Sequence, residues 1–192
     1  MFYKKVKFIS LSFITTISLT NSAFAGDFFL GGELSFGSIS GGSHYWNKYI
    51  DNDKSSKAII FGKYYSEKVR LYGFYEKDNR NDFFSYANIG GQGFLDTYRY
   101  GLGFDYSVLN SGLNSKLYFP FGLRLFKYSN SGLFESQYIV KDNNINGYGI
   151  GFLAGLGYKL TSNLSLETGW KTLYQDDSSH IGQAYLSSNF KF

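Results

Sequence analysis

The stretch Tyr98-Arg-Tyr-Gly-Leu-Gly-Phe-Asp-Tyr106 decides the fold class of this chain. Its even positions are Tyr, Tyr, Leu, Phe and Tyr, whereas its odd positions are Arg, Gly, Gly and Asp. Because successive side chains of a β-strand point to opposite faces, one face is apolar and aromatic and the other combines charge with glycine. This pattern is typical of the wall of a membrane-spanning β-barrel.

The same alternation recurs in blocks along the chain, which are separated by clusters of Asn, Asp, Ser and Gly. The blocks cover residues 27–38, 56–65, 68–77, 95–109, 116–127, 147–160, 163–174 and 181–192. Two are imperfect: Ile59 and Ile60 are adjacent, and Tyr72 and Phe74 fall on the charged face. The pattern predicts an all-β fold, an eight-stranded antiparallel up-and-down transmembrane β-barrel. A ten-strand count stays open, since residues 133–140 could extend above the membrane or form a hairpin of their own.

The connections between blocks differ in length. Short ones cover residues 66–67, 110–115 and 161–162, long ones cover 39–55, 78–94 and 128–146, and only 175–180 departs from the alternation. Outer-membrane barrels combine short periplasmic turns with longer extracellular loops. An even strand count then puts both termini on the periplasmic side.

The first 25 residues have the features of a secretory signal. Lys4, Lys5 and Lys7 precede a short apolar run over residues 8–19, and Ala23-Phe-Ala25 supplies the small-residue cleavage pattern. We predict cleavage after Ala25 and a single barrel domain over residues 26–192. The chain has no cysteine, and its net charge of +4 falls to +1 without the three lysines of the signal, so the charge gives no support for nucleic-acid binding.

A secreted β-sandwich is the main alternative, because its strands alternate too. Three features favour the barrel: the charged faces are rich in glycine, the chain ends on a strand, and aromatic residues end the apolar faces near the short turns. Tyr106, Tyr158, Phe190 and Phe192 are expected to form this girdle at the membrane interface.

Charged residues recur on the faces that point away from lipid. We expect a network inside the barrel made of Glu33, Arg70, Glu76, Arg99, Asp105, Arg124, Lys159, Glu167 and Lys171. An eight-stranded barrel is just wide enough for side chains to fill it. The favoured interpretation is a salt-bridged plug, and the alternative is a narrow ion path lined by the same groups.

The end of the chain, Tyr185-Leu-Ser-Ser-Asn-Phe-Lys-Phe192, resembles the C-terminal signal of outer-membrane proteins. Gly101-Leu-Gly-Phe-Asp-Tyr106 and Gly155-Leu-Gly-Tyr158 are similar to strand ends of the OmpA/OmpX-like barrel superfamily. The resemblance implies a bacterial outer-membrane location among lipid and lipopolysaccharide. It also implies that the barrel-assembly machinery reads the ending, with Tyr185, Leu186, Phe190 and Phe192 as its apolar residues. The sequence ends at Phe192, so we expect the barrel domain alone, without a peptidoglycan-binding domain.

A long connection carries the candidate binding residues. His44, Tyr45, Trp46 and Tyr49 fall between the first two blocks, where exposed aromatics are typical of a surface that binds a host or extracellular ligand. They could equally lie at the outer lipid interface. We therefore expect a structural or surface-interaction role, with a porin-like channel as the alternative.

A lipid A-modifying enzyme is the third alternative. His180 follows Asp176, Asp177, Ser178 and Ser179, which are the residue types of a hydrolytic triad. Their spacing does not resemble the motifs of such enzymes, and a loop of Asp and Ser is usually a solvated turn. We expect no catalytic residues, no cofactor and no metal site.

Overall fold

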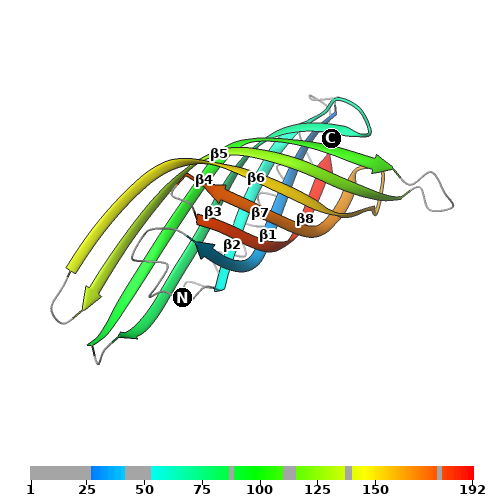
Figure 1. The fold of residues 1–192 in the computed structure, drawn as a ribbon. Helices are drawn as coiled ribbons and strands as arrows, with labels where there is room; N and C mark the ends of the chain where they lie inside the picture. Colours follow the sequence, from blue (N-terminus) through cyan, green and yellow to red (C-terminus); the bar gives the residue numbers. More distant parts are fainter. Residues whose placement is uncertain (1–26, 42–52, 87–88, 110–115, 137–139, 177–178) are drawn as a thin grey trace, which may run out of the picture.

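The computed structural model describes residues 27–41, 53–86, 89–109, 116–136, 140–176 and 179–192. They form eight strands: β1 Phe28–Gly41, β2 Asp53–Tyr64, β3 Val69–Tyr86, β4 Ile89–Leu109, β5 Leu117–Ser136, β6 Val140–Lys159, β7 Leu164–Gln175 and β8 Ser179–Lys191. Each strand pairs antiparallel with the next, and the sheet closes on itself (Figure 1). The predicted eight-stranded barrel is confirmed. The signal segment and its cleavage site lie outside the described residues.

The closing seam joins the first and last strands. β1 pairs with β8 from Phe29↔Lys191 to Gly41↔Ser179. Closure gives each strand of the wall a hydrogen-bonded neighbour on both sides, which a sheet within hydrocarbon requires because unpaired backbone groups are costly there. Among the described residues, no helix is long and apolar enough to cross a membrane.

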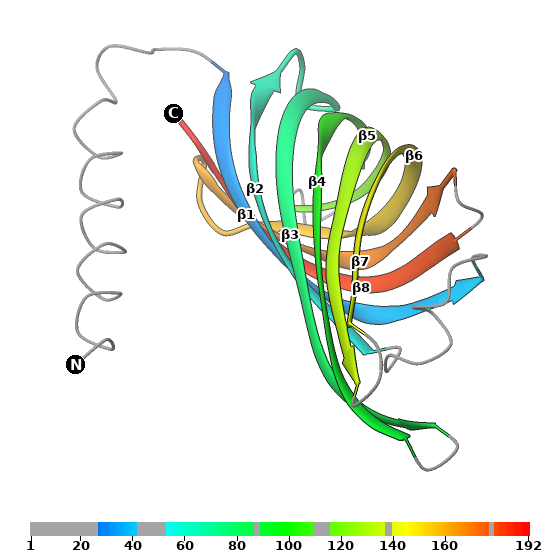
Figure 2. The same cartoon turned by 90° about the vertical axis from the view of Figure 1, so that its left-hand side faces the viewer.

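Four strands are longer than the sequence pattern predicted. β3 and β4 pair as far as Tyr86↔Ile89, and β5 and β6 pair as far as Glu135↔Val140. The predicted long connections 78–94 and 128–146 are therefore mostly paired strand, which corrects the loop assignment and resolves the 133–140 ambiguity in favour of an extension. Alternation fades in these segments because hydrogen-bonded pairing continues where no lipid face selects apolar residues. Figure 2 shows β3 to β6 running together beyond the other strands.

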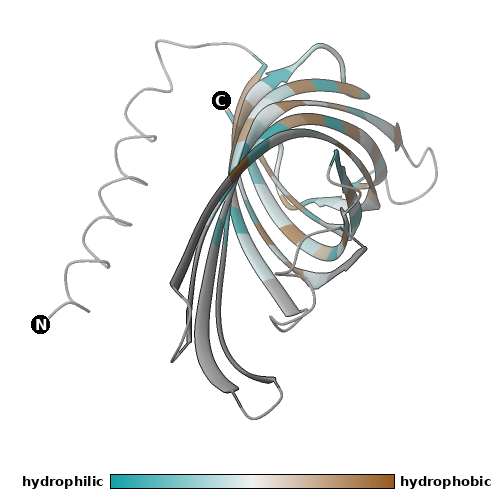
Figure 3. Cartoon of the chain, turned by 60° about the vertical axis from the view of Figure 1, so that its left-hand side comes forward, coloured by the Kyte–Doolittle hydropathy of each residue, from teal (hydrophilic) through white to brown (hydrophobic). Residues whose placement is uncertain are grey.

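Side chains alternate between the inside and the outside of the wall, as the sequence predicted. Along β8 the odd residues from Ile181 to Asn189 are buried, whereas Ala184 and Leu186 are exposed. Apolar and polar positions alternate along the barrel strands in Figure 3. The ambiguous strand β2 turns Ile60 inward and Ile59 outward. The polar face is therefore the lumen, and the apolar face is the outer surface.

Candidate functional site

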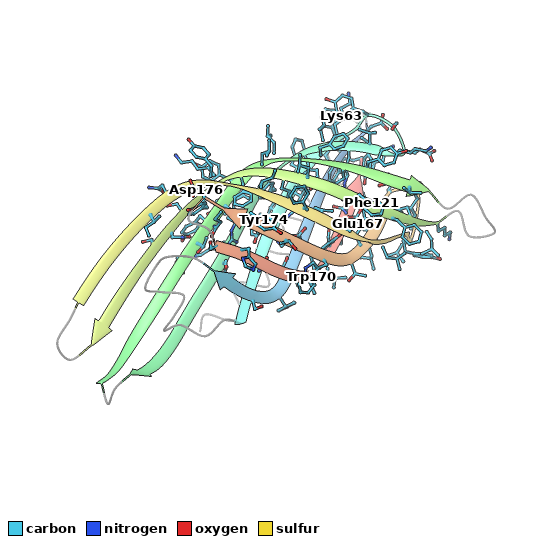
Figure 4. All side chains as sticks on the ribbon, in the orientation of Figure 1. Lys63, Phe121, Glu167, Trp170, Tyr174 and Asp176 are labelled. Atoms are coloured by element: carbon cyan, nitrogen blue, oxygen red, sulfur yellow. The ribbon has the colours of Figure 1, made fainter. Side chains whose placement is uncertain are left out.

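The outer face of the wall carries the large apolar side chains. Leu102 is 71% exposed and Trp170 54%, although both are strongly apolar. Figure 4 shows Trp170 on the outside of the barrel and Glu167 within it. Such a surface is stable only where lipid covers it.

The predicted girdle residues occupy different faces. Tyr106 and Tyr158 lie on the exposed outer face near the short turns, and Leu186 is exposed further along β8. Phe190 and Phe192 are half-buried at the end of the chain. Tyr185, the first residue of the C-terminal ending, does not share the outer face with Leu186, because its odd position turns it into the lumen, where it is only 3% exposed.

The first group of buried charges lies in the half of the lumen nearer the short turns. Arg70 donates two hydrogen bonds to Glu167, from Nη1 to Oε1 and from Nη2 to Oε2, and both are 2.7 Å long. Its Nε also donates to Asp105 at 2.7 Å. The Tyr118 hydroxyl donates to the Glu167 carboxylate at 2.7 Å. One guanidinium from β3 therefore holds a carboxylate of the neighbouring strand β4 and reaches a carboxylate of β7 across the lumen.

The second group lies further from the short turns. Arg124 forms two hydrogen bonds with Glu33, at 3.1 and 2.6 Å. The Lys171 ammonium bridges Glu33 and Glu76 at 2.8 and 2.9 Å, and Arg99 donates to Glu76 at 2.9 Å. These five side chains come from β1, β3, β4, β5 and β7, so the group ties together most of the circumference.

Tyr72 joins the two groups into one network. Its hydroxyl donates to Asp105 at 3.0 Å and accepts from Arg124 Nε at 3.1 Å. The network also includes Asp78, which lies 3.4 Å from Arg99 and which the sequence pattern did not identify. All of these charges are almost fully buried. Buried charges are tolerated only when their partners are present, so the members depend on one another.

Lys159 does not share this network, which corrects its predicted placement. It lies near the end of β6, its side chain is 40% exposed, and it faces Glu67 at 3.9 Å. Its odd position puts it on the inward face of the strand, but it lies beyond the buried charges, toward the short-turn end of the barrel. An exposed pair of this kind contributes little to stability.

Aromatic rings share the lumen with the charges, which the sequence reasoning largely missed. Phe29, Phe74 and Tyr128 are buried there although the inner face was expected to be polar. The rings lie beside glycines of the neighbouring strand: Tyr72↔Gly103, Tyr118↔Gly157, Phe126↔Gly149, Tyr128↔Gly147 and Tyr185↔Gly169 are Cα partners. A Cβ at Gly103 or Gly157 would collide with the facing tyrosine ring. A sequence pattern that could have predicted these rings is an aromatic residue on the inward face of one strand opposite a glycine on the inward face of the next.

A cavity of about 560 Å³ opens at the short-turn end of the lumen. Its lining includes the buried Tyr118 and Asn189 and the more exposed Lys191 and Asp27. The Lys191 ammonium lies 2.6 Å from Asp27, and its hydrogen bond holds the pKa of that carboxyl below the usual value. The lining residue Tyr118 donates to Glu167, so the cavity lies next to the first group of buried charges.

The residues considered for enzymatic chemistry make structural contacts. Asp176 accepts from the Tyr128 hydroxyl at 2.6 Å and from the backbone N–H of Tyr148 at 3.0 Å. Ser179 donates to Gln175 at 2.8 Å, and the ring of His180 stacks on Tyr174. No group of His, Asp or Glu within the described part of the chain could hold a metal ion.

The predicted loop-binding residues lie outside the described residues. His44, Tyr45, Trp46 and Tyr49 fall within residues 42–52, and Asp177 and Ser178 are outside as well. The surface-binding role of these residues stays a prediction.

Comparisons with known proteins give likenesses of structure. No family model and no curated protein sequence matches the chain. Among solved structures, Neisserial surface protein A matches with a TM-score of 0.63 and 17% identity, over 86% of this chain and 97% of that one. Ail, the attachment invasion locus protein of Yersinia pestis, was solved in complex with the heparin analogue sucrose octasulfate. It matches with a TM-score of 0.59 and 12% identity, over 88% of this chain and 100% of that one.

A major outer membrane protein from Thermus thermophilus matches with a TM-score of 0.54 and 13% identity, over 86% of this chain and 99% of that one. At these identities the likeness is one of fold. It confirms the fold that the strand endings predicted and agrees with the apolar outer face and charged lumen described above. The chain is therefore a small β-barrel protein of the bacterial outer membrane.

Proposed function

We propose that this protein is a closed-lumen, non-enzymatic barrel that presents a β-ribbon to a partner outside the cell. The ribbon is the part of β3, β4, β5 and β6 that continues past the barrel wall, and its free edges carry the proposal. β2 pairs with β3 only up to Ser56↔Asp78, and β7 pairs with β6 only up to Gly149↔Gln175. Beyond those pairs, Asn79–Tyr86 of β3 pairs with β4 on one side, and no described strand pairs with its other side.

The free edges offer a general means of recognition. A strand edge presents a row of backbone N–H and C=O groups, and an extended segment of a partner can pair with it. At about 3.3 Å per residue, the eight residues of β3 after Asp78 add roughly 26 Å of edge. The outer part of β6, Val140–Gly147, forms the second edge. β3 and β4 have 18 and 21 residues, whereas a tilted strand needs only about 9–11 residues to cross a membrane.

The buried network supports the choice of a closed lumen over a channel. Its long side chains reach across the interior from five strands and are held by hydrogen bonds of 2.6 to 3.4 Å. An eight-stranded barrel has little room beside such side chains. The network therefore serves as a plug in this proposal, and the working surface lies outside the membrane.

Shortening the ribbon is the test of the surface role. Replacement of residues 81–94 by Asn-Gly would join Arg80 to Leu95, which are Cα partners, through a two-residue hairpin. The same replacement of residues 131–144 would join Asn130 to Ile145. We expect both variants to fold, as judged by heat-modifiable mobility, because the wall is untouched. We expect adhesion of displaying bacteria to epithelial cells or coated matrix proteins to fall about tenfold when both hairpins are trimmed.

Trimming each hairpin singly removes one edge and shows which edge contributes. If the doubly trimmed, folded barrel adheres as well as the complete protein, the ribbon is not the working surface and the proposal fails.

Conductance tests the closed lumen. We expect no discrete openings from the refolded mature protein in a planar bilayer, because the plug leaves no continuous path. Glu33→Ala combined with Arg124→Ala removes a matched pair of long side chains and is expected to yield openings, which shows that the assay can detect them. Reproducible openings of the unaltered, heat-modifiable protein would make the channel the better interpretation.

A further inference from the structure

Lysines mark the point at which the lipid-facing surface ends on three strands. On β2 the outward positions change from Phe61 and Ile59 to Lys57, and on β3 they change from Tyr75 to Lys77. On β5 the change is from Leu125 to Lys127. All three lysines lie toward the ribbon, where the run of outward apolar residues on β2, β3 and β5 is interrupted.

Two of these lysines are placed directly side by side. Lys57 and Lys77 are Cα partners in the β2–β3 ladder and point to the same outer face. Like charges at directly opposed positions of a sheet destabilise it unless something neutralises them. An anion close to such a pair therefore stabilises the sheet.

The protein supplies only part of that negative charge. The Lys77 ammonium lies 3.4 Å from Asp96 and 5.0 Å from the centre of the Tyr98 ring. No described carboxylate lies within ion-pair distance of Lys57 or Lys127. The row therefore carries an excess of two positive charges.

The surroundings select the kind of anion. Below the lysines the wall is apolar and covered by acyl chains, and tyrosines on the same face favour the interface with headgroups. Tyr75, Tyr100 and Tyr148 are about half or more exposed at this level. An anion that meets both the lysines and the belt must be attached to acyl chains.

We propose that Lys57, Lys77 and Lys127 form a binding site on the outer wall for the phosphate groups of an outer-leaflet lipid A-type glycolipid. Adjacent strands are about 4.8 Å apart, so Lys127 lies roughly 10 Å across the sheet from Lys77, with β4 between them. The site would accept one phosphate at Lys57 and Lys77 and a second at Lys127. Lysine acts here as a point charge for phosphate. The site is independent of the ribbon and of its partner.

The probe is lipid A with two phosphates, compared with lipid A of the same acylation whose phosphates have been removed. The mature protein is refolded in zwitterionic micelles, and binding is measured by native mass spectrometry alongside the unfolding temperature from heat-modifiable mobility. We expect the phosphorylated lipid to bind about tenfold more tightly and to raise the unfolding temperature further.

Lys57→Gln combined with Lys127→Gln is expected to remove this preference, and Lys57→Arg with Lys127→Arg to retain it. Lys63→Gln is the matched control, since Lys63 lies on the same strand as Lys57 but at the opposite end of the barrel (Figure 4). Equal affinity for the two lipids would overturn the site. An equal loss in Lys63→Gln would also overturn it, because binding would then follow general charge.

Discussion

Replacement of Arg70 by methionine is expected to lower the free energy of unfolding by about 3–5 kcal/mol. The guanidinium holds Glu167 and Asp105 at 2.7 Å, and both carboxylates are buried. Methionine fills much of the same space but leaves two negative charges without their cation. The measurement is a urea titration of protein refolded into phosphatidylcholine vesicles, followed by the mobility of unboiled samples.

Lys159→Met is the control for this substitution. Lys159 is half-exposed and 3.9 Å from Glu67, so its loss is expected to change the free energy of unfolding by no more than about 1 kcal/mol. A similar effect of the two substitutions would show that the buried network contributes no more than a surface pair. The barrel would then owe its stability to the wall alone.

Gly103→Val is expected to destabilise the barrel by about 3 kcal/mol, since it overpacks the lumen and displaces a hydrogen-bonding ring. The Cβ of any side chain at Gly103 would collide with the ring of Tyr72. A displaced ring would lose its hydrogen bonds with Asp105 and Arg124, which join the two charge groups. The same urea titration measures the effect, and refolding yield reports whether the variant closes at all.

The matched control is Gly73→Val. Gly73 lies on the outer face, and the nearest atom to its added Cβ is the Gly101 carbonyl oxygen at 3.8 Å. We expect nearly unchanged stability, because the new side chain projects into lipid. If Gly103→Val were equally harmless, the pairing of ring and glycine would not limit the packing of the lumen.

The extended strands show where reasoning from sequence ended too early. Residues 78–94 and 128–146 were predicted as loops because their polar composition lacks period-two alternation, yet most of them pair as strand. Alternation records a difference in environment between two faces. Where water surrounds both faces of a strand, the residues do not alternate, although the backbone pairing continues.

Tyr72 and Lys159 show the same limit inside the barrel. The sequence placed Tyr72 on the charged face but could not show that its hydroxyl connects Asp105 with Arg124. Parity turned Lys159 inward but could not show that it lies beyond the buried rings. An odd or even position in a strand specifies only the face on which a side chain lies. The position of that side chain along the barrel axis, and its distance from side chains across the lumen, depend on how the eight strands are staggered.

The sequence by itself predicted eight strands, while leaving a ten-strand count open, and it predicted the inward or outward direction of most wall side chains and the membrane-facing character of the wall. These features follow from local alternation. Successive side chains of a strand point to opposite faces, so each residue type reflects the environment of the face on which it lies. Only the tertiary structure decided which charges pair, as with Arg70 and Glu167, which are 97 positions apart. It also decided which glycine receives which ring and how far the ribbon extends. Those choices arise only when the sheet closes, because closure sets the stagger that brings distant strands face to face across the lumen.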